Sequence, residues 1–306
     1  MAPAGSQVRK GNRELIGYSQ FPGNGMIHVF QVGAGSGGMP VLDMLVRDRR
    51  IDRVTLVEPD EYKPHNADRH VFPHSSAGEL KAVLAEAWLK ERRPDLEVNL
   101  IVADVLDTAC QPEIEAAMAV ADIGVCAVDN EPAKYHFDAL MRKHGKRWTL
   151  GEVLSGGIGG FVHAFLPGGP CYGCVASHLK RSIEVEKPAI ADYSQPGGAV
   201  KEATVPATMA SIHAIASLHA LITFELMPPP QPSGSGASPA QNGLPFTSLL
   251  LTMKQVPDLF DEAFRPFRFR IARSPECLVC RAPEREVASE DLDVALHQAF
   301  ARLGHE

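Results

Sequence analysis

The sequence predicts an α/β protein built on a doubly wound, mostly parallel sheet. Short apolar runs of strand length alternate with longer segments whose apolar residues recur at helical spacing. Strands that alternate with helices are typical of parallel βαβ units. The first apolar run stops at a glycine cluster, as expected where a buried strand turns into a helix. With 45% apolar and 22% charged residues, the 306-residue chain has an ordinary globular composition and can bury a core.

The elements follow one another in a regular order. Residues 27–32, Ile-His-Val-Phe-Gln-Val, are predicted to form the first buried strand. We expect further strands at 53–57, 97–102, 123–127, 148–153 and 161–166, and helices at 37–47, 78–92, 113–120 and 132–144. The remaining chain predicts an apolar helix at 207–226, strand-like runs at 246–253 and 267–271, and a C-terminal helix at 289–303.

Composition and charge exclude several classes of partner. The 37 acidic and 30 basic residues give a net charge of −7, which argues against binding to nucleic acid or an anionic membrane. No unbroken apolar run approaches the length of a membrane span, and the first residues lack the plan of a secretory signal. We therefore expect a cytoplasmic protein, in which paired cysteines are metal ligands before they are disulfides.

The glycine cluster predicts a phosphate-binding turn. Residues 33–38, Gly-Ala-Gly-Ser-Gly-Gly, fit G-x-G-x-x-G between a predicted strand and a predicted helix, with Gly33, Gly35 and Gly38 at the motif positions. Glu58 ends the second strand, where a carboxylate is suited to accept hydrogen bonds from ribose hydroxyls. A solvated strand-end carboxylate is the alternative for Glu58.

The segment after the second strand is too polar to be a simple turn. Residues 57–72 read Val-Glu-Pro-Asp-Glu-Tyr-Lys-Pro-His-Asn-Ala-Asp-Arg-His-Val-Phe. This run resembles the D-x-D-x-V-x-x-x-N-L-x-R-Q-x-x-F signature of the ThiF/MoeB/HesA family, relatives of ubiquitin-activating enzymes. Gly78-Glu79-Leu80-Lys81-Ala82 resembles the family's G-x-x-K-A element, and residues 122–130, which end in Asp129-Asn130, resemble its D-x-V-x-x-x-x-D-N strand end. His70 stands where the family usually has Gln, and Ala67 where it has Leu.

The resemblance implies an ATP-dependent adenylyltransferase. Negative charge builds on the pyrophosphate that leaves, so cations are needed beside it. Arg69 and Lys81 would supply this charge, and Asp129 would hold Mg²⁺. The nucleotide-binding set is Gly33, Gly35, Gly38, Glu58, Asp60, Asn66, Arg69, Lys81, Asp129 and Asn130, with Arg69, Lys81 and Asp129 as catalytic residues. Each also has a simpler interpretation, as surface charges for Arg69 and Lys81 or as a helix cap for Asp129-Asn130.

Four cysteines form two C-x-x-C pairs, which predict a zinc site. Cys171 and Cys174 make the first pair, and Cys277 and Cys280 the second, far along the chain. Two such turns supply a tetrahedral set of four thiolates, which leaves no coordination position for water and so favours a structural role. A thioredoxin-type redox site, which needs one pair, is the alternative. The same layout occurs in the ThiF/MoeB family.

These features divide the chain into three parts. Residues 1–26 are an N-terminal segment, 27–170 a nucleotide-binding Rossmann-like domain, and 171–306 a zinc-linked C-terminal part of strands and helix. The last part includes an aperiodic crossover loop at 181–206 and a low-complexity, flexible linker at 228–243.

The leading functional hypothesis is ATP·Mg²⁺-dependent adenylation of the C-terminal carboxylate of a ubiquitin-like or sulfur-carrier protein, or of a peptide. Members that form a thioester or persulfide carry a cysteine in the crossover loop, and residues 175–206 contain none. The reaction would then stop at the acyl adenylate, or the acyl group would pass directly to the thiol of a separate carrier enzyme. The resemblance also implies a homodimer and an arginine from the N-terminal segment, Arg9 or Arg13, at the nucleotide. An NAD-dependent oxidoreductase with a structural zinc and a catalytically silent scaffold that binds a ubiquitin-like protein are the alternatives.

Overall fold

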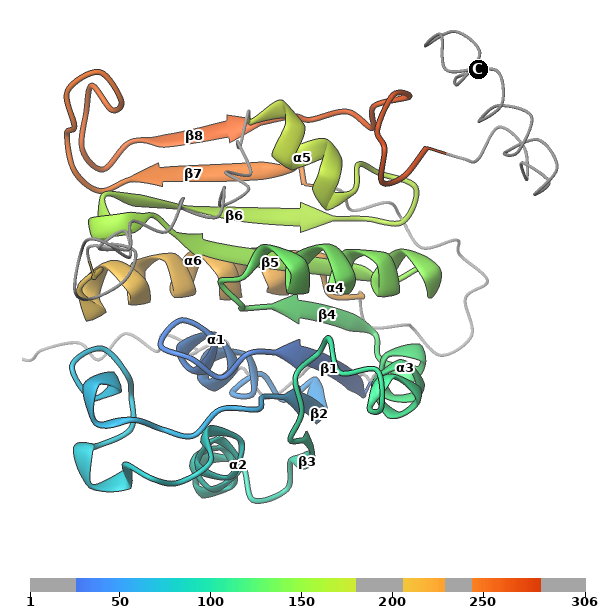
Figure 1. The fold of residues 1–306 in the computed structure, drawn as a ribbon, viewed down its shortest axis with the longest axis vertical. Coiled ribbons are helices and arrows are strands. Elements are labelled where there is room, and N and C mark those ends of the chain that lie inside the picture. The colour runs from blue at the N-terminus through green and yellow to red at the C-terminus, as the bar shows by residue number, and fades with distance from the viewer. Residues whose placement is uncertain (1–25, 180–205, 229–243, 282–306) are drawn as a thin grey trace, which may run out of the picture.

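The structure is a computed structural model that describes residues 26–179, 206–228 and 244–281. Eight strands form one sheet in the order β3-β2-β1-β4-β5-β6-β7-β8. The pairings from β3 to β5 are parallel, and those from β5 to β8 are antiparallel. The strands are β1 (Ile27–Val32), β2 (Ile51–Val57), β3 (Glu97–Ile101), β4 (Ile123–Cys126), β5 (Arg147–Val153), β6 (Gly159–Phe165), β7 (Ser248–Thr252) and β8 (Pro266–Phe269) (Figure 1).

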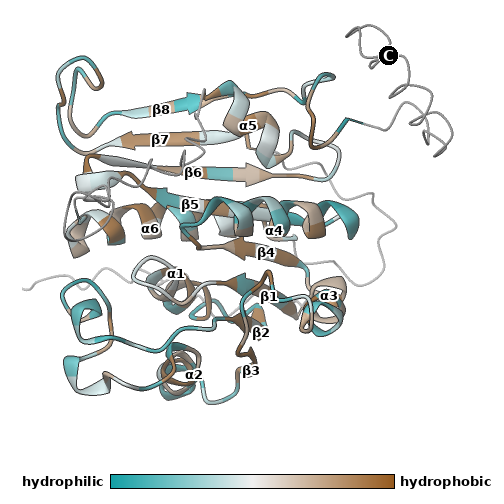
Figure 2. Ribbon diagram, in the orientation of Figure 1, coloured by the Kyte–Doolittle hydropathy of each residue, from teal (hydrophilic) through white to brown (hydrophobic). Residues whose placement is uncertain are grey.

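Helices cover both faces of this sheet, which confirms the doubly wound fold. The helices are α1 (Gly38–Leu45), α2 (Lys81–Arg92), α3 (Gln111–Val120), α4 (Glu131–Lys143), α5 (Tyr172–His178) and α6 (Met209–Leu226). One core cluster joins α1, α2 and α6 to one face, and a second joins α3, α4 and α5 to the other. In Figure 2 the strands carry much of the hydrophobic colour, whereas the visible side of α4 is largely hydrophilic.

The topology leaves a crevice where strand order reverses. After β1 the chain enters α1 on one face, and after the neighbouring β4 it enters α4 on the opposite face. The connections therefore diverge at the carboxyl ends of β1 and β4, where open α/β sheets bind ligands. Both the glycine loop and Asp129 follow these strand ends.

Most predicted elements are present with small differences at their ends. The helix expected from residue 78 begins at Lys81, because Gly78 adopts a φ of 98° and Leu80 makes a β-bridge with Glu61. The predicted C-terminal helix at 289–303 lies outside the described residues, as do nearly all of the crossover loop and the linker. β7 and β8 extend the sheet of the first 170 residues, because β7 pairs with β6 and β8 pairs with β7.

The apolar helix α6 packs against β5, β6 and α1. Within the described residues, α6 alone is long and apolar enough to cross a bilayer, with a mean hydropathy of 1.4 over 18 residues, and 44% of it is buried. Its core-facing residues include Ile212, Ile215 and Ile222. These contacts account for the apolar composition of α6 as a helix of the protein core.

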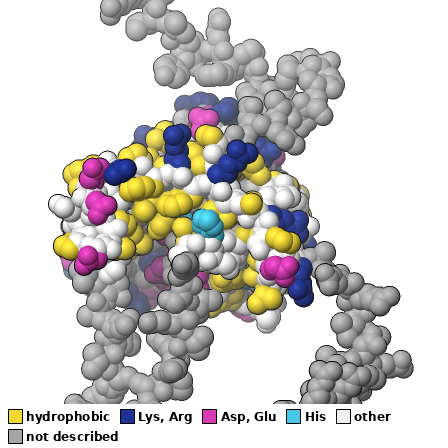
Figure 3. Space-filling view, turned by 90° about the horizontal axis from the view of Figure 1, so that it is seen from above, with side chains coloured by type: hydrophobic (Ala, Val, Ile, Leu, Met, Phe, Trp, Pro, Cys, Tyr) yellow, Lys and Arg dark blue, Asp and Glu magenta, His cyan; other side chains and the backbone are white. Residues whose placement is uncertain are grey.

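The β8 end of the sheet is an edge of mixed character. Phe267 and Phe269 are half-buried and alternate with the exposed Arg268 and Arg270. Figure 3 looks down on this end of the molecule and shows hydrophobic side chains gathered beside Lys and Arg. Such alternation is expected of an edge strand that covers the core on one side only.

Candidate active site

The glycine loop is a tight turn between β1 and α1. Gly33 has a φ of 96°, and a Cβ built there would lie 2.5 Å from the carbonyl oxygen of Ala127. A Cβ on Gly38 would collide with the carbonyl oxygen of Gly33, so both positions require glycine for close packing. A Cβ on Gly35 would meet nothing within 4 Å, which shows that this residue faces open space.

The loop presents unpaired backbone donors to that space. Within the described residues, no hydrogen bond uses the amides of Gly35, Ser36, Gly37 or Gly38. The first amides of a helix lack intrahelical acceptors and carry the positive end of the helix dipole. The geometry therefore fits an anion such as a phosphate group above the start of α1.

A cavity of about 800 Å³ opens beside the loop at the carboxyl ends of the central strands. Its walls include residues of β1, the segments that follow β2, β4 and β5, and the first turn of α4. Eight of the ten nucleotide-binding residues expected from the sequence line it: Gly33, Gly35, Glu58, Asp60, Arg69, Lys81, Asp129 and Asn130. The structure thus brings residues from four sequence segments into one cavity.

Two of the cations that line this cavity, Lys81 and Arg69, differ in their partners. Lys81 is 9% exposed at the start of α2, and its Nζ lies 2.6 Å from Oδ2 of Asp60. Arg69 is half-buried and makes no ion pair with any described residue. Its guanidinium therefore remains available to an anionic ligand, to which it could donate in a bidentate manner.

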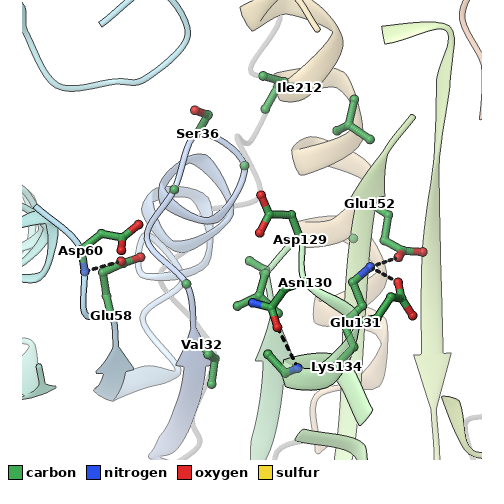
Figure 4. Close-up of a pocket in the computed structure, with 18 of the residues that line it drawn as sticks. Val32, Ser36, Glu58, Asp60, Asp129, Asn130, Glu131, Lys134, Glu152 and Ile212 are labelled. Atoms are coloured by element: carbon green, nitrogen blue, oxygen red, sulfur yellow. Dashed lines mark hydrogen bonds and ion pairs between the residues drawn. The ribbon is translucent and has the colours of Figure 1, made fainter. Parts of the chain in front are cut away.

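Asp129 and Asn130 lie between β4 and α4. Asp129 is exposed, and in Figure 4 its carboxylate points into the cavity on the side opposite Glu58 and Asp60. Asn130 is the N-cap of α4, with its Oδ1 accepting a hydrogen bond of 2.8 Å from the amide of Ala133. The helix-cap alternative therefore describes the side chain of Asn130, while Asp129 remains free to hold a hard cation.

The remaining expected residues have other local contacts. Both carboxylate oxygens of Glu58 accept backbone amides, Oε2 from Ala34 at 2.5 Å and Oε1 from Asp60 at 2.9 Å. Burial raises the pKa of Glu58, although these two hydrogen bonds oppose the rise. Asn66 accepts a hydrogen bond from the amide of Lys63 and, like Gly38, does not line the cavity within the described chain.

The far wall of the cavity holds a buried ionic group that the sequence analysis did not identify. Lys134, 5% exposed on α4, lies 2.7 Å from Glu131 and 2.6 Å from Glu152 (Figure 4). Burial alone would lower the pKa of Lys134, but the two carboxylates outweigh it and raise the pKa. Glu152 also bonds His163, which therefore belongs to this network. The position of Glu152 at the carboxyl end of β5 was the sequence signal that could have found it.

The four cysteines of the two C-x-x-C pairs meet at the N-terminal end of α5. All four Sγ atoms lie within 4.8 Å of one another and are buried, with pair distances of 3.7, 3.5 and 3.6 Å. Four sulfurs around a tetrahedral zinc at its usual bond length would be about 3.8 Å apart. The residues present therefore fit the zinc predicted from the sequence, and the cluster joins residues 171–174 to the C-terminal segment.

Fold and site together define a doubly wound α/β protein with a glycine loop at the switch point of its sheet. The ThiF family model matches residues 24–256, and the chain belongs to the ThiF family. This confirms the family resemblance found in the sequence.

Individual relatives match over smaller regions. Ubiquitin-like modifier-activating enzyme 5 of Drosophila erecta is 27% identical over 152 residues, which cover 47% of this chain and 38% of the relative. The same enzyme of Gallus gallus is 26% identical over 153 residues, with the same shares. The match thus spans less than two fifths of these curated relatives.

Solved structures of Escherichia coli MccB share the fold. MccB with AMPCPP and MccA aligns with a TM-score of 0.57 and 18% identity, over 83% of this chain and 66% of MccB. MccB with ATP aligns with a TM-score of 0.55 and 18% identity. At this level of identity the likeness concerns the fold.

Proposed function

We propose that the chain adenylates the C-terminal carboxylate of a ubiquitin-like protein, a sulfur-carrier protein or a peptide, with ATP as the second substrate. The observation that carries this proposal is the convergence of the glycine loop, Arg69, Lys81 and Asp129 on one cavity. Family membership and the similarity to proteins named ubiquitin-like modifier-activating enzyme 5 support it.

The reaction would use the donors and cations around the loop. A substrate carboxylate oxygen attacks the α-phosphorus of ATP, and the bond from that phosphorus to the α–β bridging oxygen breaks. Pyrophosphate leaves with the electron pair, and an acyl adenylate remains. Arg69 and Lys81 would stabilise the negative charge on the leaving pyrophosphate, and the unpaired amides from Gly35 to Gly38 would bind phosphate oxygens.

Asp129 would be the protein ligand of a magnesium ion. The exposed carboxylate is a hard oxygen donor that points into the cavity. When bound, Mg²⁺ would neutralise phosphate charge and help to orient the leaving group.

The pKa values of the two cysteines outside the four-cysteine cluster bear on where the acyl group is transferred. Cys126 is fully buried, and burial raises its pKa to about 12. Burial and the nearby Asp107 also raise the pKa of Cys110. Neither thiol therefore has the lowered pKa of a reactive cysteine. We propose that the thiol of a separate carrier enzyme attacks the acyl carbon of the adenylate, so that a thioester forms on that enzyme and AMP leaves. We also propose that the protein acts as a cytoplasmic homodimer; Arg9 and Arg13 lie outside the described residues.

The test is ATP–pyrophosphate exchange with a panel of ubiquitin-like proteins, sulfur-carrier proteins and peptides as carboxylate donors. We expect exchange with at least one donor, and a loss of about a hundredfold or more in Arg69→Ala. Arg49→Ala is the matched control, because that arginine is exposed, pairs with Asp95 and does not line the cavity. Exchange with no donor, together with an NAD-dependent change in absorbance, would instead support the oxidoreductase.

A further inference from the structure

Buried side chains form hydrogen bonds with the backbone of the glycine loop. Gln31 is fully buried on β1, and its Nε2 donates to the carbonyl oxygens of Gly33 and Gly38, both at 2.9 Å. This single amide group bridges the two ends of the loop. Gln31 fixes Gly33 and Gly38, so the conformation of the loop between them depends on the contacts that begin at Ala34.

Ala34 is held on both sides by side chains from a different part of the chain. Its amide donates to Glu58 Oε2 at 2.5 Å, and its carbonyl oxygen lies 2.9 Å from His70 Nε2. The other ring nitrogen, Nδ1, accepts from the amide of Phe72 at 3.3 Å. A carbonyl can only accept and an amide can only donate, so the ring is neutral with its proton on Nε2.

We propose that Glu58 and His70 are positioning residues that clamp Ala34 and so aim the amides of Gly35, Ser36 and Gly37 at the triphosphate of ATP. The proposal rests on the proposed function and gives Glu58 a role in the loop in addition to the ribose binding expected from the sequence. Glu58 is 4% exposed and both of its oxygens already accept amides. The amides that follow Ala34 are the unpaired donors of the loop within the described residues.

Burial makes this clamp sensitive to substitution. His70 is 4% exposed and packs against the rings of Tyr62 and Phe72, so water cannot replace its hydrogen bond to Ala34. Burial also lowers the pKa of His70, which favours the neutral ring that both partners require. A variant that lacks the donor leaves a buried carbonyl unsatisfied.

The first arm of the test measures hydrogen exchange of the full chain without nucleotide. His70→Leu and Glu58→Gln should accelerate exchange of the Ala34 amide, the hydrogen-bonded amide of the clamp, about tenfold, because each variant loses part of the clamp. His70→Gln keeps a donor and an acceptor and should restore slow exchange. The control is His74→Leu, which changes an exposed histidine in the same segment. Unchanged exchange in His70→Leu would overturn the clamp even if the protein binds no ATP.

The second arm separates loop positioning from ribose binding. Affinities for ATP, 2′-deoxy-ATP and 3′-deoxy-ATP are measured by calorimetry in the wild type, Glu58→Gln and His70→Leu. The clamp predicts that each variant weakens all three nucleotides, the deoxy nucleotides included, by about tenfold. If Glu58→Gln removes only the discrimination between ATP and a deoxy nucleotide and leaves the affinity for the deoxy nucleotide unchanged, Glu58 acts on the ribose alone and the proposal falls. A wild type that binds none of the three contradicts the proposed function, while the exchange arm still decides the clamp.

Discussion

Lys81 Nζ lies 2.6 Å from Asp60 Oδ2, so two residues expected at the nucleotide are paired with each other in this structure. The pair is asymmetric: the side chain of Lys81 is 11% exposed and that of Asp60 is 61% exposed. Asp60 thus lies largely in solvent, whereas Lys81 is held in the cavity wall. We interpret Asp60 as the residue that holds Lys81 in place before an anion arrives.

Replacement of this lysine should affect catalysis more than stability. Lys81→Met keeps the length of the side chain and removes the charge, so we expect ATP–pyrophosphate exchange to fall about a hundredfold or more. The partly exposed ion pair contributes at most about 1 kcal/mol to folding. Exchange rates and urea unfolding would be compared with Lys63→Met, an exposed lysine of the same segment. Full activity in Lys81→Met would remove Lys81 from the site.

Asp129 should determine the dependence of activity on magnesium. Asp129→Asn removes one negative charge from the cation's surroundings, so the Mg²⁺ concentration for half-maximal exchange should rise about tenfold. The measurement is a magnesium titration at saturating ATP, with Asp107→Asn as the control at an exposed carboxylate away from the cavity. An identical titration curve for Asp129→Asn would place the metal on other ligands.

The four-cysteine cluster should bind one zinc per chain and stabilise the protein. Cys277→Ser removes one of four buried sulfurs, and we expect the free energy of unfolding to fall by more than about 4 kcal/mol. Metal content by atomic emission and unfolding in urea provide the measurements. Cys110→Ser is the control, because Cys110 lies outside the cluster and should leave zinc content unchanged. A wild type purified without metal, and as stable as after added zinc, would contradict the assignment.

His219 should make stability fall at acidic pH. It is 2% exposed, its Nε2 lies 2.9 Å from Thr149 Oγ1, and burial lowers its pKa to about 3. The unfolded state takes up this proton near pH 6.5, whereas the folded state does so only near pH 3. The contribution of neutral His219 to the free energy of unfolding is therefore fully present above about pH 6.5. It falls by about 1.4 kcal/mol per pH unit as the pH drops from about 6.5 towards about 3.

His219→Leu removes this contribution. Urea unfolding between pH 7 and pH 5 should show a smaller loss of stability in His219→Leu than in the wild type. His65→Leu, at an exposed histidine, should retain the wild-type slope. Equal slopes for the wild type and His219→Leu would show that this imidazole titrates normally.

Local patterns predicted the elements and the members of the cavity better than they predicted side-chain partners. The glycine loop and Asp129 follow strand ends, and parallel strands bring such ends together, so their convergence follows from topology. The contacts of Glu58 could not be predicted, because they depend on where the Ala34 amide lies in the folded loop. Lys134 resembled an ordinary lysine of a helix, and its burial depends on β5, which supplies Glu152.

The extension of the sheet was a second nonlocal feature. The runs at 246–253 and 267–271 predicted strands. The pairing of β7 with β6 joins segments far apart in the sequence, which no local pattern encodes, and β8 adds to β7. The two C-x-x-C pairs were the exception, because the chemistry of zinc requires four sulfurs to meet regardless of their separation. The division of the chain at residue 170 stays a prediction.

The most direct test of the central claim is the affinity for ATP·Mg²⁺ of the wild type and of Gly35→Ala, measured by calorimetry beside their melting temperatures. A methyl group at Gly35 meets no protein atom within 4 Å and should leave the melting temperature unchanged. We predict that it weakens ATP binding about tenfold or more, because it occupies the space in which a phosphate approaches the loop. Equal affinities of Gly35→Ala and the wild type would show that ATP does not bind over this turn.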